Sequence, residues 1–270
     1  SPLQSAVQPI SIAGGFVMRK KLLSLGLALL ALAGCADLQI NLRDMPKAGP
    51  PTEAEIIAGL KEALTLGARK GAEKLAARDG YYGDPLVRIP LPDEARVIAD
   101  NIGRVPGGKK LLEDLIVSIN RAAEDAAREA APVFAASIQK MTVSDGLGIL
   151  HGPDDAATSY LRKTTHDGLY SLYRPKIAAS TDKKLVAGVS ARETWVSLTG
   201  KWNTLAGSAA GRIAGFSPVN TDLDDFLTRK ALDGIYLKLA GEELKIRKEI
   251  SARVTPLLRK VFALLDGKRG

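Results

Sequence analysis

The stretch KKLLEDLIVSINRAAEDAAREAA, residues 109–131, carries the clearest structural signal in the chain. Its apolar residues recur every three or four positions and form one stripe: Leu112, Leu115, Ile116, Ile119, Ala123, Ala126 and Ala130. The polar residues Arg121, Asp125 and Arg128 fall on the opposite side. This spacing matches the 3.6-residue period of an amphipathic α-helix, which Pro132 then breaks or kinks.

The preceding part of the chain predicts a second long helix. Thr52-Glu53-Ala54-Glu55 matches a capping box, in which Thr is the N-cap and Glu is the third helical residue. Apolar positions then recur at helical spacing: Ile56, Leu60, Leu64, Ala68, Ala72 and Leu75. Gly67 and Gly71 lie four residues apart on this helix, although interior glycine costs about 0.5–1 kcal/mol relative to alanine. We expect the close approach of another helix to offset that cost.

The rest of the chain predicts further helices and no sheet. We expect helices at 93–106, 133–141, 144–150, 153–163 and 166–179, one carrying Trp195 and Trp202, and two more starting at Asp222 and Thr255. The Gly- and Ala-rich residues 206–218 are expected to be a surface loop. Aromatic residues make up only 5% of the chain, which disfavours a β-sandwich. The prediction is an all-α single domain of about 8–10 helices, several of them short, over residues 52–266, with a tail at 267–270.

The N-terminal region has the order of a bacterial secretory signal. Met18-Arg19-Lys20-Lys21 is a short positive segment, and an apolar run follows over residues 22–32. This run is shorter than the roughly 20 residues that a transmembrane helix needs. We expect translation to start at Met18, so residues 1–34 comprise an upstream extension and a signal peptide. Residues 35–51, with several prolines, are expected to be a tether.

The signal ends in Leu32-Ala33-Gly34-Cys35, which looks like a bacterial lipobox. Cys35 is the only cysteine of the chain, so its thiol would carry the lipid and Cys35 would be the first residue of the mature protein. Two or more acyl chains anchor a protein stably in a membrane. The expected location is therefore the bacterial cell envelope, facing the periplasm, and Ala36 favours the outer membrane. The alternative is a secreted soluble protein in which this cysteine has no such role.

The net charge of +8 falls to +5 when residues 1–34 are removed, because that segment holds Arg19, Lys20 and Lys21 and no acid. Most of the remaining charge lies in residues 241–270, whose basic residues are Lys245, Arg247, Lys248, Arg253, Arg259, Lys260, Lys268 and Arg269. This segment could bind anionic lipid headgroups or a cell-wall polymer. Alternatively, its apolar side packs on the core and its charges are solvated. Nucleic acid is not an expected partner in the envelope, and protein partners are left open.

Catalytic and metal-binding motifs are incomplete. Residues 103–109 match G-x-x-x-x-G-K, but Lys110 follows where a phosphate-binding loop has Ser or Thr. Two S-x-x-K patterns, at 137–140 and 180–183, lack the companion motifs of penicillin-binding enzymes. His151 and His166, with Asp154 and Asp155, follow no familiar zinc spacing. We therefore expect no cofactor, no metal and no assigned catalytic residue, with a hydrolase using His151 or His166 as base as an open alternative.

Several short motifs resemble one bacterial family. They are Asn120-Arg-Ala-Ala-Glu124, Ile149-Leu-His-Gly152, Ala156-Ala-Thr-Ser-Tyr-Leu161, Lys230-Ala-Leu-Asp-Gly234, and Glu243 with Ile246-Arg247. The chain resembles the family catalogued as domain of unknown function 4197 over roughly residues 56–262. The resemblance implies a helical envelope protein, often a lipoprotein, and no established activity. This chain departs from the family pattern in a longer Gly-rich connector at 206–215.

The resemblance also points to eight polar residues as one possible cluster between helices: Asn120, Arg121, Glu124, Asp145, Thr158, Tyr160, Glu243 and Arg247. Such a cluster could hold helices in register, or it could form the base of a ligand pocket. The leading functional hypothesis is a non-enzymatic envelope lipoprotein that binds or organises another envelope component. A carrier of an apolar or lipid ligand is the second hypothesis, because many small residues lie on helix faces.

Overall fold

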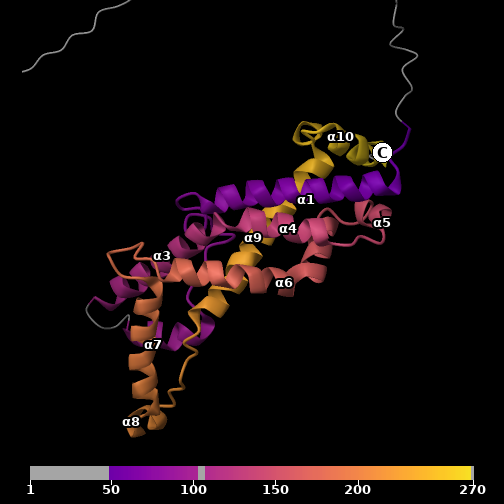
Figure 1. Cartoon of the computed structure of the whole chain (residues 1–270). Helices are drawn as coiled ribbons and strands as arrows, with labels where there is room; N and C mark the ends of the chain where they lie inside the picture. Colours follow the sequence, from indigo (N-terminus) through magenta and orange to yellow (C-terminus); the bar gives the residue numbers. More distant parts are fainter. Residues whose placement is uncertain (1–48, 103–106, 269–270) are drawn as a thin grey trace, which may run out of the picture. The chain divides into compact units, whose positions relative to one another are not determined.

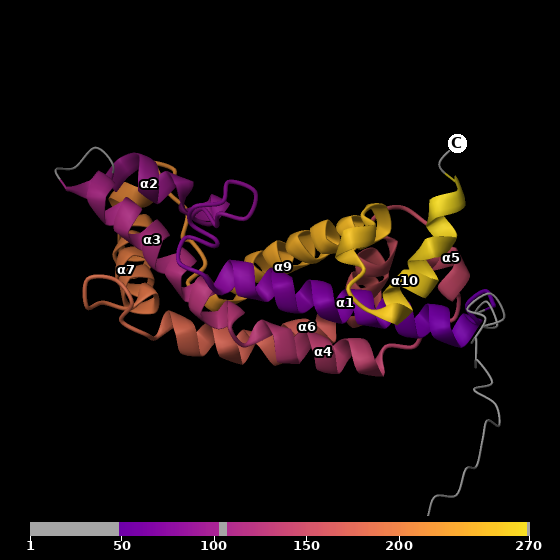
Figure 2. The ribbon, with the colours of Figure 1, turned by 90° about the horizontal axis from the view of Figure 1, so that it is seen from above.

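Two long helices, α1 and α9, pack along each other at the centre of the domain (Figures 1 and 2). The computed structural model describes residues 49–102 and 107–268. Within these ranges the α-helices are α1 (Glu53–Ala76), α2 (Arg96–Ile102), α3 (Gly108–Ala127), α4 (Ala130–Lys140), α5 (Gly146–Leu150), α6 (Ala156–Thr181), α7 (Ala191–Gly207), α8 (Ala209–Ile213), α9 (Leu223–Lys248) and α10 (Pro256–Phe262). Three short 3₁₀ segments complete them at Asp93–Ala95, Ile250–Ala252 and Ala263–Lys268.

The all-α prediction is confirmed, since these described ranges contain no strand beyond an isolated bridge between Val186 and Val189. Residues 49–270 form one compact unit. The expected signal peptide, Cys35 and most of the expected tether lie outside the described residues. Among the helices of the described part, none is long and apolar enough to cross a membrane.

Helix α1 begins and packs as its sequence predicts. The Thr52 hydroxyl accepts a hydrogen bond from the Glu55 backbone N–H, and the Glu55 carboxylate accepts one from the Thr52 N–H, which completes the capping box. All six residues of the predicted apolar stripe are buried. They face α9, α4 and α3, so α1 contributes to the core on more than one side.

The other helices surround this central pair. Helix α6 lies against α9, α3 and α4, and its residues Leu169, Tyr173 and Ile177 are fully buried. At one end of the domain, α7 packs on α3 and is followed by α8. At the other end, α5 and α10 pack against α1 (Figure 2).

Two expectations for the chain between residues 153 and 218 are wrong. The segments predicted as separate helices, 153–163 and 166–179, form the single helix α6, because no residue between them breaks a helix. Pro175 is accommodated within α6 on its exposed side, where water can reach the Ser171 carbonyl that loses its partner. The connector 206–218 contains the short helix α8 and is therefore not wholly a loop; Ser208 caps this helix through the Gly211 N–H.

Gly67 and Gly71 face α9, as the glycine spacing predicts. A Cβ atom on Gly71 would lie 3.1 Å from the Cβ of Lys238, and one on Gly67 would lie 3.5 Å from the Cβ of Glu242. Gly59 is more restricted, since its Cβ would lie 2.8 Å from Cγ2 and 3.0 Å from Cβ of Val261 in α10. Helices α9 and α10 thus approach α1 where α1 lacks side chains.

These contacts predict opposite effects for two alanine substitutions in α1. Gly67→Ala meets ordinary van der Waals contacts, so it should raise the free energy of unfolding by up to about 1 kcal/mol through helix propensity. Gly59→Ala gains the same propensity but overpacks against fully buried Val261, so it should lower that free energy by about 1–3 kcal/mol. Urea unfolding followed by circular dichroism measures both, and equal changes would contradict the close α1–α10 contact.

Glu242 of α9 pairs with Lys74 of α1 and with Lys245 of its own helix. Its Oε1 atom accepts hydrogen bonds from Lys74 Nζ of α1 at 2.6 Å and from Lys245 Nζ at 2.8 Å. Desolvation by burial would by itself raise the pKa of this carboxyl, but the hydrogen bonds from Lys245 and Lys74 outweigh it and lower the pKa to about 2. Glu242 is therefore charged in the folded protein over most of the acid range.

This lowered pKa predicts a specific acid sensitivity. The contribution of Glu242 to stability is complete above its ordinary pKa of 4.5 and is lost as the pH falls towards about 2. Glu242→Gln should therefore flatten the fall in the free energy of unfolding between these two pH values. Glu73→Gln, in an exposed pair with Arg69, is the control and should leave the pH profile unchanged. Identical profiles for wild type and Glu242→Gln would refute the role of this carboxylate.

Candidate functional site

Asn120, Arg121 and Glu124 of α3 hold the loop at residues 77–92. The Asn120 side chain accepts a hydrogen bond from the Ile89 N–H at 2.9 Å and donates one to the Ile89 carbonyl at 2.8 Å. Glu124 Oε1 accepts from the N–H groups of Tyr81 and Tyr82, both at 3.2 Å. Arg121 donates to Glu124 Oε2 at 2.5 Å and to Asp79 at 2.6 Å. Side chains of α3 thus satisfy backbone groups that a buried loop would otherwise leave unpaired.

Glu243 and Arg247 of α9 form a second network with α5 and α6. Both are almost fully buried, with exposures of 1% and 2%, and they form an ion pair at 2.7 Å. The Glu243 carboxylate accepts from the N–H groups of Ala157 and Thr158 at 3.0 and 2.8 Å, and from the Thr158 hydroxyl at 2.6 Å. It therefore occupies the N-terminus of α6, where the helix dipole favours a negative charge.

The guanidinium of Arg247 binds the C-terminal end of a helix. It donates to the carbonyls of Leu150 at 2.7 Å and Ile149 at 3.1 Å, at the C-terminus of α5. A positive charge is favoured there for the same electrostatic reason. One ion pair therefore joins α9 to the end of one helix and to the beginning of the next.

Asp145 and Tyr160 belong to neither network. Asp145 is the N-cap of α5 and accepts from the Gly148 N–H at 2.6 Å. The Tyr160 hydroxyl donates to the Thr142 carbonyl at 2.8 Å. The eight residues expected to form one cluster are thus divided into an α3 network, an α9–α6–α5 network and two contacts that hold the segment before α5.

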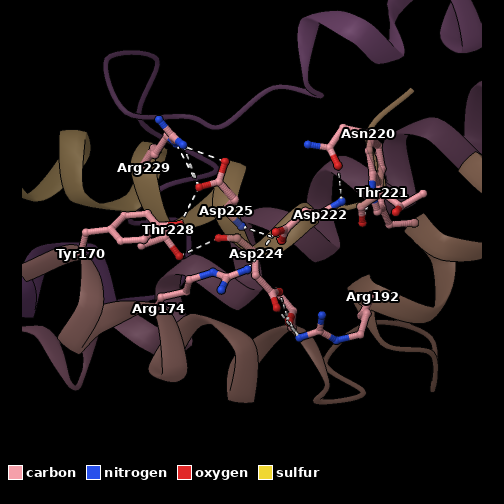
Figure 3. Close-up of polar contacts among 12 residues, drawn as sticks. Tyr170, Arg174, Arg192, Asn220, Thr221, Asp222, Asp224, Asp225, Thr228 and Arg229 are labelled. Carbon is pink, nitrogen blue, oxygen red and sulfur yellow. Dashed lines mark hydrogen bonds and ion pairs between the residues drawn. The ribbon is translucent and has the colours of Figure 1, made fainter. Parts of the chain in front are cut away.

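A third network lies at the N-terminus of α9, and the sequence analysis did not single it out (Figure 3). Asp222 caps the helix through the Asp225 N–H at 3.0 Å. The buried Asp224 accepts from the Thr181 hydroxyl at 2.8 Å and pairs with Arg192 at 2.7 Å. Asp225 accepts from the Tyr170 hydroxyl, and this bond lowers the pKa of Asp225. The available signal was an aspartate at the N-cap of one helix and two more in its first turn.

A polar hollow of about 500 Å³ lies between the loop at 86–90, α6 and α9. Two walls of this hollow carry residues of the first two networks, because Asn120 holds Ile89 and Glu243 holds Thr158. The Arg162 and Asp233 side chains in its lining form an ion pair. The two networks therefore fix the position of two wall residues, Ile89 and Thr158. Of the charged residues in the lining, Arg162 and Asp233 already neutralise each other.

An apolar groove of about 870 Å³ lies between the start of α3 and α7. Its lining includes Ile102, Leu111, Leu198, Trp202 and Leu205. Leu111 and Leu205 are 42% and 46% exposed, which is unusual for large apolar side chains that lie together. Its volume is within the range of about 300–1,000 Å³ typical of small-molecule sites. None of the eight expected site residues lines this groove.

The basic C-terminal segment is largely paired with acids. Its ion-pair partners are Glu242 for Lys245, Glu243 for Arg247, Asp154 for Lys248, Asp266 for Arg253 and Glu55 for Lys260. Arg259 donates to backbone carbonyls. The apolar side of α10 is buried through Leu258, Val261 and Phe262. Among the described residues of this segment, few cations are therefore available to bind an anionic surface.

One S-x-x-K pattern and the two histidines from the sequence analysis make contacts that stabilise the fold. Ser180 and Lys183, from one S-x-x-K pattern, both bind the carboxylate of Asp125. His151 is the C-cap of α5, and His166 lies on α6 beside the ring of Tyr236. Within the described ranges, no group of three or more His, Cys, Asp or Glu residues could hold a metal ion.

The family model described as "Protein of unknown function (DUF4197)" matches residues 50–263. The chain belongs to this family. The DUF4197 match extends over all ten described α-helices, so the family resemblance and the compact unit coincide. No curated protein matches the chain, and no solved structure does either.

The buried pair in this DUF4197 domain predicts a large loss of stability when one partner is removed. Glu243→Gln leaves the Arg247 guanidinium buried without its counter-charge, so the free energy of unfolding should fall by about 3–5 kcal/mol. Arg247→Met should cost a similar amount. The double variant should lose less than the two single losses together, because neither charge then remains unpaired.

An exposed pair at the same end of α9 provides the matched control. Asp154 and Lys248 are 54% and 53% exposed at the side chain. Asp154→Asn should change the free energy of unfolding by no more than about 1 kcal/mol. Urea unfolding of the four variants measures these differences. Strict additivity of Glu243→Gln and Arg247→Met would contradict a coupled buried pair.

Proposed function

We propose that this chain is a lipid-anchored protein of the bacterial envelope, facing the periplasm and attached through Cys35 to the outer membrane. Its helical domain is a binding module and not an enzyme. The signal-like residues 18–34 and the lipobox-like ending support the anchor. The observation that carries the binding function is the open apolar groove between α3 and α7.

The use of the buried charges supports a binding role over a catalytic one. A general base or acid must reach a proton of the substrate. Glu243 and Arg247 instead bind helix ends, and Asp224 binds Thr181 and Arg192. These groups stabilise helix ends inside the domain, and the apolar groove between α3 and α7 lies elsewhere.

A carrier of an apolar ligand is the more specific form of this proposal. Concave apolar surface is the usual basis of small-molecule binding, with a few polar groups fixing the orientation. The groove has such a lining, including the indole of Trp202, whose Nε1 atom donates to the Ser217 carbonyl at 3.0 Å. Binding of a protein or of a cell-wall polymer is an alternative. The apolar groove supports these alternatives less directly than it supports a small apolar ligand.

The anchor predicts a simple labelling result. Because Cys35 is the only cysteine, Cys35→Ala in the full chain should abolish labelling by a palmitate analogue and move the protein from the membrane to the soluble envelope fraction. Ala36→Ser, which keeps the thiol, is the control and should be labelled as wild type. Membrane retention and labelling of Cys35→Ala would overturn the anchor, whatever the domain binds.

A further inference from the structure

The described lining of the apolar groove holds one basic and one acidic side chain. Lys201 of α7 lines the groove and has no acidic partner among the described residues. Glu193 is the acidic residue of the lining, but its carboxylate accepts the Ser190 N–H at 3.0 Å in the capping box of α7. The groove therefore combines apolar walls with a cation, Lys201, that forms no ion pair among the described residues with Glu193, which lies eight residues earlier in the first turn of α7.

The start of α3 adds to this positive character. Gly107 and Gly108 line the groove, and Gly107 is an N-cap with φ 79° and no side chain to accept from the first helical N–H groups. The first turn of α3 holds no acid and instead carries Lys109 and Lys110. Lys110 pairs with Asp114, whereas Lys109 has no acidic partner in the described part of the chain. The N-terminal end of a helix without a side-chain cap favours an anion beside it.

We propose that this groove binds a single-chain amphiphile with an anionic headgroup, such as a long-chain fatty acid. The alkyl chain covers Leu111, Leu198 and Leu205, and the headgroup lies near Lys201 and the start of α3. The inference rests on the proposed binding function and names the ligand class of the same groove. Charge complementarity favours this occupant over a neutral or cationic amphiphile, because either would leave Lys201 without a counter-charge.

Three dodecyl amphiphiles with different headgroups test this assignment: dodecanoate, neutral dodecyl maltoside and cationic dodecyltrimethylammonium. Each is titrated below its critical micelle concentration into residues 35–270 carrying Cys35→Ala, so that no covalent acyl chain competes. This chain includes the whole compact unit from residue 49. Calorimetry gives the affinity, and a change in Trp202 fluorescence locates the ligand, because Trp202 lines the groove while Trp195 does not.

Dodecanoate should bind at least about tenfold more tightly than the other two amphiphiles. Lys201→Gln should weaken dodecanoate binding about three- to tenfold and leave dodecyl maltoside unchanged, whereas Lys230→Gln, on α9 outside this groove, should change neither. Leu205→Ser should weaken all three. Val196→Ser is its matched control, since Val196 is 50% exposed on the same helix and does not line the groove.

Different failures have different meanings. Equal binding of the three amphiphiles, or no effect of Lys201→Gln, overturns the headgroup assignment and leaves the binding function intact. Dimerisation that buries Trp202 and is lost in Leu205→Ser makes a second copy the occupant and also overturns the ligand class. If no amphiphile binds and no self-association occurs, the groove is not a binding site, and both the inference and the binding function fail.

Discussion

Helix ends that are buried inside a protein need partners for their backbone groups, and this domain meets that requirement mainly with charged side chains. The clearest case is the Glu243–Arg247 pair, whose carboxylate binds the start of α6 and whose guanidinium binds the end of α5. A helix of only five residues such as α5 has little stability of its own. Its position, and the turn from α5 into α6, therefore depend on a pair that belongs to α9.

The same requirement explains the other two networks. Glu124 and Asn120 satisfy backbone groups of the loop that covers α3, and Asp222 caps α9. A buried charge is costly unless it is paired and hydrogen-bonded, and the buried Glu124 both pairs with Arg121 and accepts two backbone hydrogen bonds. The arrangement stabilises one register of the helices, since a shift by one residue would separate every side chain from its backbone partner. Polar residues of this kind contribute specificity of fold more than catalytic chemistry.

How much of this could be predicted from sequence differs between levels of structure. Helical periodicity predicted α1, α3 and α9, because each buries a stripe that repeats along a single segment. It failed at α6, where it predicted two helices, at 153–163 and 166–179, and the structure has one. The sequence indicated which polar residues matter, but it did not indicate which of them lie together. Asn120 binds Ile89, 31 positions away, and Glu243 binds Thr158, 85 positions away. The groove was missed for the same reason, as Leu111 and Leu205 come from distant helices.

The family motifs and the groove occupy different parts of the domain. The motifs that carry the resemblance supply the buried networks and part of the polar hollow, through Asn120, Thr158, Asp233 and Glu243. The groove is instead lined by residues outside those motifs, many of them on α7. Its walls can therefore change without disturbing the ion pairs that hold the helix ends. In physical terms, the networks hold the fold together, while other residues, on α3 and α7, line the groove that we propose as the binding surface.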